Sequence, residues 1–387
     1  MKILHLAPIK GLKETHDKID EVIQVPPEGI SVSVPRLAEG QINSGHEVGI
    51  VSPYFSKSTL SSNVYWKSLA NYNLLSFLFR GPYNEVIKDF GKPDILNVHD
   101  IYNLKQIIFS LHFLLSGTKL FITPRGTFSK TALSRSKYKK LVFLFFYKAY
   151  AFFIFSFIAL NKNEKKQIQN IFPRNRIIII GNGVEYDEKR NAKLESYFQD
   201  KSLRKDIKIG FLGRFDVYIK GLDILLNAYS EYQRSTNNIN IRLSLLGEHR
   251  VREYDSREFI ERIRRDLPYP ELLEVAGPFY GNSKWTELAK LDLLIQPSRT
   301  EGMPNTVLEA MSAGVPCAVT PNTNVGDLII KAQAGWVVRA TSKDFLDFFH
   351  SLESCSKNEL LQLGGNAKKY AKENLTWDKI GKLKYFN

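Results

Sequence analysis

Two glutamates frame a glycine-proline turn in the segment RTEGMPNTVLEAMSAG, residues 299–314. Glu301 stands directly before the turn, and Glu309 follows eight positions later. A pair of carboxyl groups can serve as the acid and base of glycoside hydrolysis. Ionised carboxylates can also accept hydrogen bonds from neighbouring sugar hydroxyl groups, because they carry only acceptors. The element that carries the two acids decides between these chemistries.

The segment predicts a helix that begins beside the turn. Proline is tolerated in a first helical turn and asparagine is a favoured N-cap, so Pro304 and Asn305 mark the start. Gly314 marks the end, where a left-handed residue closes many helices. The N–H groups around residues 303–306 then point out of the helix and attract anionic oxygens. The helix start is therefore a predicted anion site.

Acids beside an anion site suit the hydroxyl groups of the ligand better than its phosphates. We therefore interpret Glu301 and Glu309 as ligands of ribose or hexose hydroxyl groups rather than as an acid–base pair. In the alternative interpretation, Glu301 only stabilises the helix dipole and Glu309 is a surface residue.

A second candidate site lies in GFLGRFDVYIKGLDILLNA, residues 210–228. Arg214 and Lys220 flank a turn between an expected strand and an expected helix. Two fixed cations at this place predict a diphosphate site, because phosphate oxygens favour charge-assisted donors. The P-loop spacing Gly-x4-Gly-Lys-Ser/Thr is absent. In the alternative, both cations are surface charges.

Three residues of the N-terminal half follow or end strands. Gly29 lies in the turn after the first strand, where a glycine lets the backbone approach a ligand closely. No Gly-x-Gly-x-x-Gly surrounds it, which disfavours a nicotinamide cofactor. His99 ends the strand DILNVH, and Arg125 follows the strand LFITP. We expect both at a ligand, because open parallel sheets bind ligands at the carboxyl ends of their strands. The alternative for His99 is a core histidine.

The elements that must position these residues alternate between short apolar strands and helices, which predicts parallel sheets covered on both faces. Expected strands are KILHLAP, HEVGIVS, DILNVH, LFITP and FIFSFIAL, then IKIGFLG, IRLSLLG, LLEVAG, LDLLIQP and PCAVTP. At 387 residues the α/β chain is too long for one core. We expect two doubly wound Rossmann-like domains facing each other across a cleft. They are residues 1–184, completed by a C-terminal helix over 370–387, and residues 205–369, with 185–206 as linker and connecting elements.

The net charge of +14, from 54 Lys and Arg against 40 Asp and Glu, indicates an anionic partner or, alternatively, a solvated basic surface without a specific partner. Seven basic residues and no acidic residue lie between Arg125 and Lys148. We expect a helix over 134–152 and a strand over 154–160. A transmembrane span over 141–160 is an alternative that Lys148, near its middle, disfavours. Residues 130–152 predict contact with an anionic membrane surface or, alternatively, a core helix with a basic solvent face.

The ordered motifs of the chain resemble those of glycosyltransferase family 4, nucleotide-sugar-dependent enzymes of the GT-B fold. The motifs are EGI, LAEGQINSGHEV, NVHD, GNGVE, GRFDVYIKGLDILLNA, AGPF and PSRTEGMPNTVLEAMSAGVPCAV, and they cover nearly the whole chain. The resemblance implies retaining, metal-independent transfer of a hexose from a UDP-sugar or GDP-sugar, without a cofactor. The implied acceptor is a saccharide or a lipid-linked saccharide, in synthesis of a bacterial surface polysaccharide such as lipopolysaccharide.

The resemblance also implies individual roles. Glu309 would bind the ribose hydroxyl groups, and Glu301 would bind the donor sugar together with the backbone that follows it. Arg214 and Lys220 would neutralise the diphosphate, which Gly29 would approach. The implied catalytic residues are Arg214, Lys220, Glu301 and His99, and the implied donor-binding residues are Gly29, Arg125, Gly302, Met303, Pro304, Asn305, Thr306 and Glu309.

Two positions depart from the family pattern. Glu28 stands where relatives have the first glycine of a Gly-Gly pair, and Arg125 stands where many have a histidine that contacts the donor sugar. That contact passes either to Arg125 or to His99.

Two other functions are kept as alternatives. One is a non-catalytic protein that binds nucleotide sugars or polyanions, and the other is a nucleotide-sugar epimerase of the same fold. Two cysteines cannot build a disulfide framework, which fits a reducing cytoplasm. We expect a cytoplasmic protein, peripheral at the inner face of the membrane, with no nucleic acid partner.

Overall fold

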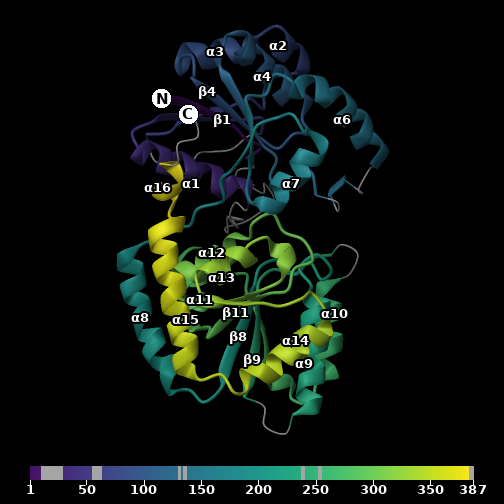
Figure 1. The fold of residues 1–387 in the computed structure, drawn as a ribbon, viewed down its shortest axis with the longest axis vertical. Coiled ribbons are helices and arrows are strands. Elements are labelled where there is room, and N and C mark those ends of the chain that lie inside the picture. The colour runs from purple at the N-terminus through teal and green to yellow at the C-terminus, as the bar shows by residue number, and fades with distance from the viewer. Residues whose placement is uncertain are drawn as a thin grey trace, which may run out of the picture. The chain divides into compact units, whose positions relative to one another are not determined.

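Two all-parallel sheets with helices on both faces organise the chain (Figure 1). The structure is a computed structural model and describes residues 1–9, 29–54, 63–129, 132–133, 137–236, 240–251 and 255–382. Unit 1 consists of Met1–Gly183 and Trp377–Asn387, and unit 2 consists of Val184–Thr376. This arrangement confirms the predicted fold class, two Rossmann-like α/β domains.

The sheet of unit 1 has the strand order β3-β2-β1-β4-β5-β6-β7. Its strands are β1 (Lys2–Leu6), β2 (Glu47–Ser52), β3 (Tyr65–Ser68), β4 (Ile95–His99), β5 (Lys119–Thr123), β6 (Ser156–Ala159) and β7 (Ile177–Ile179). Its helices are α1 (Ile30–Asn43), α2 (Leu74–Leu78), α3 (Gly81–Asp89), α4 (Leu104–Leu115), α6 (Lys137–Ala151), α7 (Lys162–Ile171) and α16 (Trp377–Gly381). The winding reverses between β1 and β4, and such a switch point opens a crevice at the carboxyl ends of the strands.

The sheet of unit 2 has the order β10-β9-β8-β11-β12-β13, with its switch point between β8 and β11. Its strands are β8 (Ile207–Leu212), β9 (Ile241–Leu246), β10 (Leu273–Ala276), β11 (Leu293–Gln296), β12 (Cys317–Val319) and β13 (Gly335–Val337). Its helices are α8 (Glu188–Leu203), α9 (Leu222–Ser235), α10 (Ser256–Arg265), α11 (Gly281–Lys290), α12 (Asn305–Ser312), α13 (Gly326–Lys331), α14 (Ser342–Leu352) and α15 (Lys357–Tyr370). Separate apolar cores cover the two faces of this sheet.

All ten expected strands are present, and three more lie at sheet edges. β3, β7 and β13 have three or four residues each, and none of their residues is fully buried. Interior parallel strands are buried on both faces and therefore appear in the sequence as continuous apolar runs. β3 and β13 are short, half-buried edge strands with a weaker pattern, whereas β7 is a clear run of isoleucines that the sequence analysis missed.

Most of the segment 185–206, expected as linker and connecting elements, forms the helix α8 (Glu188–Leu203). The carboxylate of Asp187 accepts hydrogen bonds from the N–H groups of Lys189 and Arg190 and so caps the start of α8. Leu194 is buried in the core of unit 2. A largely polar sequence thus folds as a helix because a cap and one apolar side fix it, and α8 belongs to unit 2 rather than to a linker.

The C-terminal segment is not one helix over 370–387. Residues 371–375 form a π-helix in unit 2, whereas α16 belongs to unit 1, and residues 383–387 lie outside the described residues. Glycine lets α16 approach α1 closely, since a Cβ atom at Gly40 would lie 2.3 Å from the carbonyl oxygen of Trp377. The segment that completes unit 1 therefore begins at Trp377 and not at Tyr370.

The helix expected over 134–152 and the strand expected over 154–160 are confirmed where the structure describes them, as α6 and β6. Residues 134–136, and with them Arg135, lie outside the described residues, as does Lys130. Among the helices of the described ranges, none combines the length and the apolar character needed to cross a bilayer. The apolar run is instead divided between a helix and a strand of unit 1.

Two adjacent glycines of α15 allow a matched test of the packing that holds α12. A Cβ atom at Gly364 would lie 2.2 Å from the carbonyl oxygen of Gly314, which ends α12, whereas a Cβ atom at Gly365 meets nothing within 4 Å. We expect Gly364→Ala to lower the free energy of unfolding by about 1–3 kcal/mol through overpacking. Gly365→Ala should raise it by roughly 0.5–1 kcal/mol, because alanine favours a helix. Urea unfolding of both variants checks this, and equal effects would contradict the packing.

Candidate functional site

The loops after β8 and β11 leave the sheet of unit 2 side by side, because the two strands are neighbours. Gly221, in the first loop, has a φ of 68°, and a Cβ atom there would lie 2.2 Å from the carbonyl oxygen of Pro297 in the second loop. The two guanidinium NH groups of Arg299 also bind the two carboxylate oxygens of Asp223, both at 2.6 Å. A glycine contact and a bidentate ion pair therefore lock the loops together.

Lys220 and Glu301 meet across these two loops. Lys220 Nζ lies 2.6 Å from Glu301 Oε1, and the two side chains are 17% and 16% exposed. The Ser298 hydroxyl donates to the same carboxylate oxygen at 3.0 Å and accepts a hydrogen bond from Gln296 Nε2 at 2.8 Å. The structure thus joins a cation predicted for the diphosphate with an acid predicted for the sugar.

The predicted helix start beside Glu301 is present, but its cap differs from the prediction. α12 begins at Asn305, and Pro304 takes the N-cap position, where a proline side chain cannot accept a capping hydrogen bond. Asn305 lies inside the first turn and therefore cannot be the cap, because the proline already holds the extended conformation that precedes the helix. The end is as predicted, since Gly314 has a φ of 78°.

Asn324 supports the turn before α12 from a neighbouring loop. Its side-chain amide donates to the carbonyl oxygens of Glu301 and Gly302, at 2.6 and 3.3 Å. Met303 and Thr306 follow in the turn and the helix, and both are half-buried. The sequence analysis missed Asn324, because nothing in the local pattern shows that a residue 23 positions later returns to this turn.

Glu309 lies one turn inside α12 and forms an ion pair. Its Oε1 is 2.6 Å from Nζ of Lys284 on α11, and both side chains are largely buried. Lys284 was also missed, since it follows a tyrosine-glycine turn with no recognisable motif. Arg214 lies exposed in the loop directly after β8. The residues predicted for the donor in unit 2 therefore come from the ends of β8 and β11 and from α12.

In unit 1, Arg125 connects two other predicted residues. Its Nε donates to Nδ1 of His99 at 3.1 Å, and NH1 donates to the hydroxyl of Ser33 at 2.9 Å. That hydroxyl donates to the carbonyl oxygen of Gly29, which has a φ of 56° and precedes α1. Gly29, His99 and Arg125 thus belong to one hydrogen-bonded cluster at the carboxyl end of the sheet.

The catalytic role expected for His99 does not fit its position. The side chain is fully buried, and both ring nitrogens are engaged, Nδ1 by Arg125 and Nε2 by His5 at 3.0 Å. A substrate therefore has no ring nitrogen of His99 to contact. Arg125 is half-buried, and its contact with the donor sugar stays a prediction.

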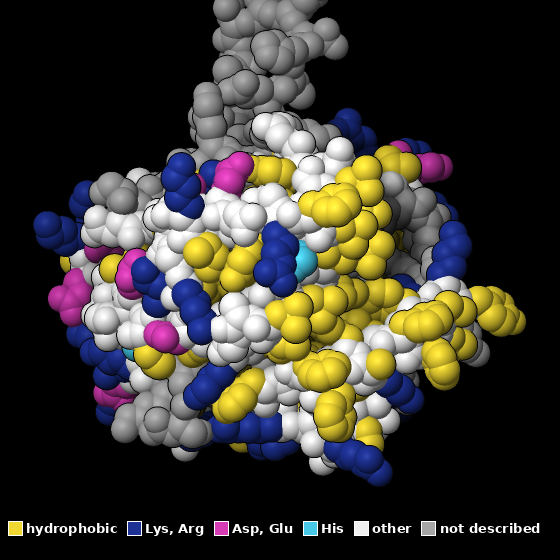
Figure 2. Space-filling model, turned by 90° about the horizontal axis from the view of Figure 1, so that it is seen from above, with side chains coloured by type: hydrophobic (Ala, Val, Ile, Leu, Met, Phe, Trp, Pro, Cys, Tyr) yellow, Lys and Arg dark blue, Asp and Glu magenta, His cyan; other side chains and the backbone are white. Residues whose placement is uncertain are grey.

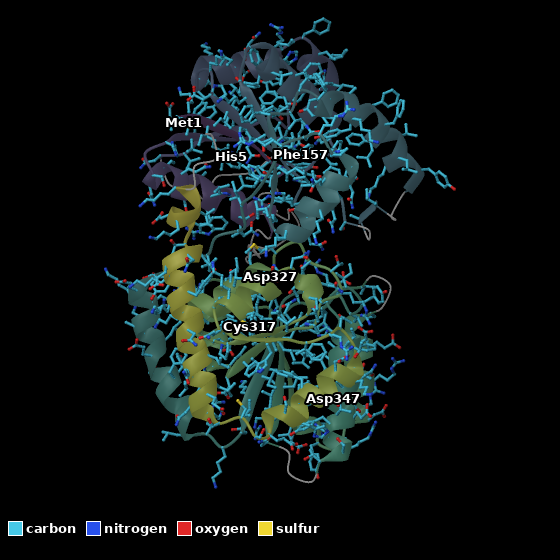
Figure 3. The ribbon with its side chains drawn as sticks, viewed as in Figure 1. Met1, His5, Phe157, Cys317, Asp327 and Asp347 are labelled. Atoms are coloured by element: carbon cyan, nitrogen blue, oxygen red, sulfur yellow. The ribbon has the colours of Figure 1, made fainter. Side chains whose placement is uncertain are left out.

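Burial keeps both histidines of this cluster neutral. It lowers the pKa of His5 from 6.5 to about 4, against the hydrogen bond to Gln41, which raises it. Burial also lowers the pKa of His99 well below 6.5, and the charge of Arg125 acts in the same direction. His5 lies inside unit 1 (Figure 3). In the residues that the structure describes, no group of three or more His, Cys, Asp or Glu is arranged to hold a metal ion.

Two family models match the chain. The model described as Glycosyltransferase Family 4 matches residues 27–188, and the model described as Glycosyl transferases group 1 matches residues 206–354. The capsular polysaccharide biosynthesis glycosyltransferase CapM of Staphylococcus aureus is 25% identical over 226 residues, 55% of this chain and 55% of the relative. The chain therefore spans about half the length of this relative.

Two solved structures share the fold over 98% of this chain. HepE of Anabaena, in complex with UDP and glucose, has a TM-score of 0.66 and 15% sequence identity, and 97% of that chain is covered. WaaG, a glycosyltransferase involved in lipopolysaccharide biosynthesis, has a TM-score of 0.63 and 16% identity, and 98% of that chain is covered. At this identity the likeness shows the fold, which is the expected GT-B fold.

The buried histidines predict a pH dependence of stability. In the unfolded chain both return to a pKa near 6.5, so their contribution is complete above that pH and is lost as the pH falls toward 4. The free energy of unfolding should decrease by about 1.4 kcal/mol per pH unit for each histidine below about pH 6.5. Urea unfolding from about pH 7.5 to about pH 5 measures this slope. The double variant His5→Asn/His99→Asn should flatten it, and an unchanged slope would contradict the assignment.

Proposed function

We propose, from the premise that the chain belongs to glycosyltransferase family 4, that it transfers a hexose from a nucleoside diphosphate sugar with retention of anomeric configuration. The proposed acceptor is a saccharide or lipid-linked saccharide of a surface polysaccharide. The observation that carries the proposal is the Lys220–Glu301 pair beside the start of α12, at the switch point of unit 2. Open α/β sheets bind nucleotides at such a point.

Each group of unit 2 suits one part of such a donor. The Glu309 carboxylate, one turn inside α12, suits the ribose hydroxyl groups, and the Glu301 carboxylate suits hexose hydroxyl groups. The cations of Arg214 and Lys220 suit the diphosphate, as does the N-terminus of α12. HepE, which shares the fold, was solved with UDP and glucose, and this supports a UDP-sugar. The donor roles of Gly29 and Arg125 in unit 1 stay predictions.

The proposed reaction needs no proton exchange by a side chain and uses no metal ion. The bond between the anomeric carbon and the diphosphate oxygen breaks, and the acceptor oxygen bonds to that carbon on the same face. The proton of the acceptor hydroxyl passes to the departing diphosphate. Arg214 and Lys220 would stabilise the negative charge that develops there, and fixed charges aimed at a developing charge are a large source of catalysis. Because Glu301 holds the Lys220 ammonium, loss of this acid would also misplace that charge.

Substitution of the donor residues tests the proposal. A thermal-shift screen of UDP-sugars and GDP-sugars first identifies the donor, since a ligand of the folded state raises Tm. We expect Lys220→Ala and Glu309→Ala to reduce kcat/KM for hexose transfer by about 100-fold or more. The control is Arg339→Ala. The side chain of Arg339 is 81% exposed and forms an ion pair with Asp344. Full activity of Lys220→Ala would contradict the assigned role.

The products of the same assay separate the alternatives. A transferase releases the nucleoside diphosphate and labels the acceptor, whereas an epimerase converts one nucleotide sugar into another. A binding protein without catalysis gives a thermal shift and no new compound.

The second part of the proposal concerns α6, whose outer side is apolar. Leu144, Tyr147 and Tyr150 face the core of unit 1, but Phe145 and Phe146 are 73% and 69% exposed. Large aromatic side chains on the solvent side of a helix often mark a surface that binds a partner or a membrane. The core-helix alternative accounts for the buried side of α6 and for its exposed lysines, but it gives no reason for the exposure of Phe145 and Phe146.

The helix α2 also carries exposed apolar side chains, and it packs against α4. α4 contacts α6 through the hydroxyl groups of Ser110 and Tyr150, at 2.6 Å, and contacts α2 through the rings of Phe109 and Phe77. Figure 2 shows hydrophobic side chains gathered over this part of unit 1, with lysines and arginines among them. We call the exposed side chains of Leu75, Leu78, Phe79, Leu141, Phe145 and Phe146 the apolar face.

The occupant that we propose for the apolar face is the surface of an anionic membrane. Lys139 and Lys148 are exposed on α6 itself, and the whole chain carries a net charge of +14. Aromatic side chains enter the boundary of the acyl chains while nearby lysines bind anionic head groups. A lipid-linked acceptor lies at the same surface, so docking would bring the enzyme to its substrate.

Vesicle sedimentation tests this docking. We expect Phe145→Asp/Phe146→Asp to weaken binding to vesicles of phosphatidylglycerol and phosphatidylcholine by about tenfold or more, since each buried aromatic contributes roughly 1.5–3 kcal/mol. Lys139→Glu/Lys140→Glu should weaken binding only to the anionic vesicles, by about 1 kcal/mol per lysine. The control Leu203→Asp changes an exposed leucine of unit 2. Binding that neither double variant alters would contradict the proposal.

A further inference from the structure

Two buried histidines and a glutamine connect the core of unit 1 to Arg125. His5 on β1 lies beside His99 at the end of β4, with Nδ1 of His5 and Nε2 of His99 3.0 Å apart. Nε2 of His5 lies 2.7 Å from Oε1 of Gln41 on α1. All three side chains are at most 2% exposed. Hydrogen bonds thus link Gln41, His5, His99 and Arg125 in this order.

Arg125 fixes the direction of this chain. A guanidinium group has only donors, so Nδ1 of His99 must be the acceptor for Arg125 Nε. The proton of neutral His99 then lies on Nε2 and is donated to Nδ1 of His5. The proton of His5 consequently lies on its Nε2 and is donated to Gln41 Oε1. Only one tautomer of each histidine satisfies every contact.

Arg125 is held from a second side as well. Its NH1 donates to the Ser33 hydroxyl and to Oδ1 of Asn182, at 2.9 and 3.2 Å. Ser33 and Asn182 are buried, and Arg125 itself has a φ of 54°. A positive φ is unfavourable for a residue other than glycine, so contacts with neighbouring residues must hold it there. Residues with this backbone conformation are frequent at functional sites.

We infer that His5, Gln41 and His99 are positioning residues, whose one-directional chain of hydrogen bonds aims the Arg125 guanidinium at an oxyanion of the substrate. This inference rests on the proposed function, which supplies the ligand. The positive charge of the guanidinium, which neutral partners hold in place, favours the oxygens of a phosphate or a carboxylate. The oxyanion is either the diphosphate of the donor or the carboxylate of an acidic sugar. His99 acts through Arg125 and touches no substrate.

We call the hydrogen bonds that link Gln41, His5, His99 and Arg125 the relay. Substitution of His99 by asparagine and by glutamine tests it. The Oδ1 of asparagine can stand where Nδ1 of His99 accepts from Arg125, whereas the longer glutamine places its amide near the former Nε2. We expect His99→Gln and Arg125→Gln to weaken binding of the same ligand about tenfold or more, and the double variant to add nothing further. His99→Asn should weaken it by less than about threefold, because it keeps the acceptor for Arg125. His112→Gln, which removes another partly buried histidine of unit 1, is the control and should leave affinity unchanged.

Calorimetry with UDP, UDP-glucose and UDP-glucuronate separates the two oxyanions. If Arg125 binds the diphosphate, Arg125→Gln weakens all three ligands equally, and if it binds a carboxylate, only UDP-glucuronate is affected. Unchanged affinities for all three would overturn the inference. So would an equal loss of Tm and an equal affinity in His99→Asn and His99→Gln, since a purely structural role predicts that result.

Nitrogen NMR of histidine-labelled full-length protein tests the relay without a ligand. The ring signals of His5 and His99 should both report a proton on Nε2, and Arg125→Gln should release the tautomer of His99. A proton on Nδ1 of His99 in the unaltered protein would overturn the relay. If these signals are as expected while neither these three ligands nor the GDP-sugars bind, the relay stands, and the oxyanion contact and the proposed function are both overturned.

Discussion

The contact between Gly221 and the carbonyl oxygen of Pro297 is the constraint on which the site of unit 2 depends. Parallel pairing of β8 with β11 sends two loops out of the same edge of the sheet, and a side chain at Gly221 would force them apart. Lys220 pairs with Glu301 across the loops that this contact brings together, and Arg299 pairs with Asp223 in the first turn of α9. Backbone packing therefore sets the positions of the charges before any ligand is bound.

In unit 1, the cation at the carboxyl edge of the sheet is held in a different way. There the cation Arg125 is held by neutral acceptors, a histidine ring, a hydroxyl group and an amide. Neutral partners leave the charge of the guanidinium in place, whereas the carboxylate beside Lys220 offsets much of the charge of its partner. The two units thus present cations of different effective strength, although both place them after parallel strands.

The sequence was informative wherever local pattern determines structure. Interior strands appear in the sequence as apolar runs. This made it possible to predict that Lys220, Glu301 and Arg125 lie in loops at the carboxyl ends of strands. Contacts between distant segments were not predictable in this way: His5 lies 94 residues from His99, and Lys284 lies 25 residues from Glu309. His99 appeared suited to catalysis because its place at a strand end is visible in the sequence and its burial against His5 is not. Asn305 was misassigned as a cap because the residue before it, a proline, fills that role.

The relay of unit 1 also has an evolutionary consequence. The residues at positions 5, 41, 99 and 125 are joined by successive hydrogen bonds. A substitution at any of them therefore changes the donors and acceptors available to the others. A histidine in place of Arg125 would remove the obligatory donor, and both buried imidazoles would then be free to exchange tautomers. A lineage that exchanges arginine for histidine at this position therefore encounters epistasis, and the residues at these four positions should covary.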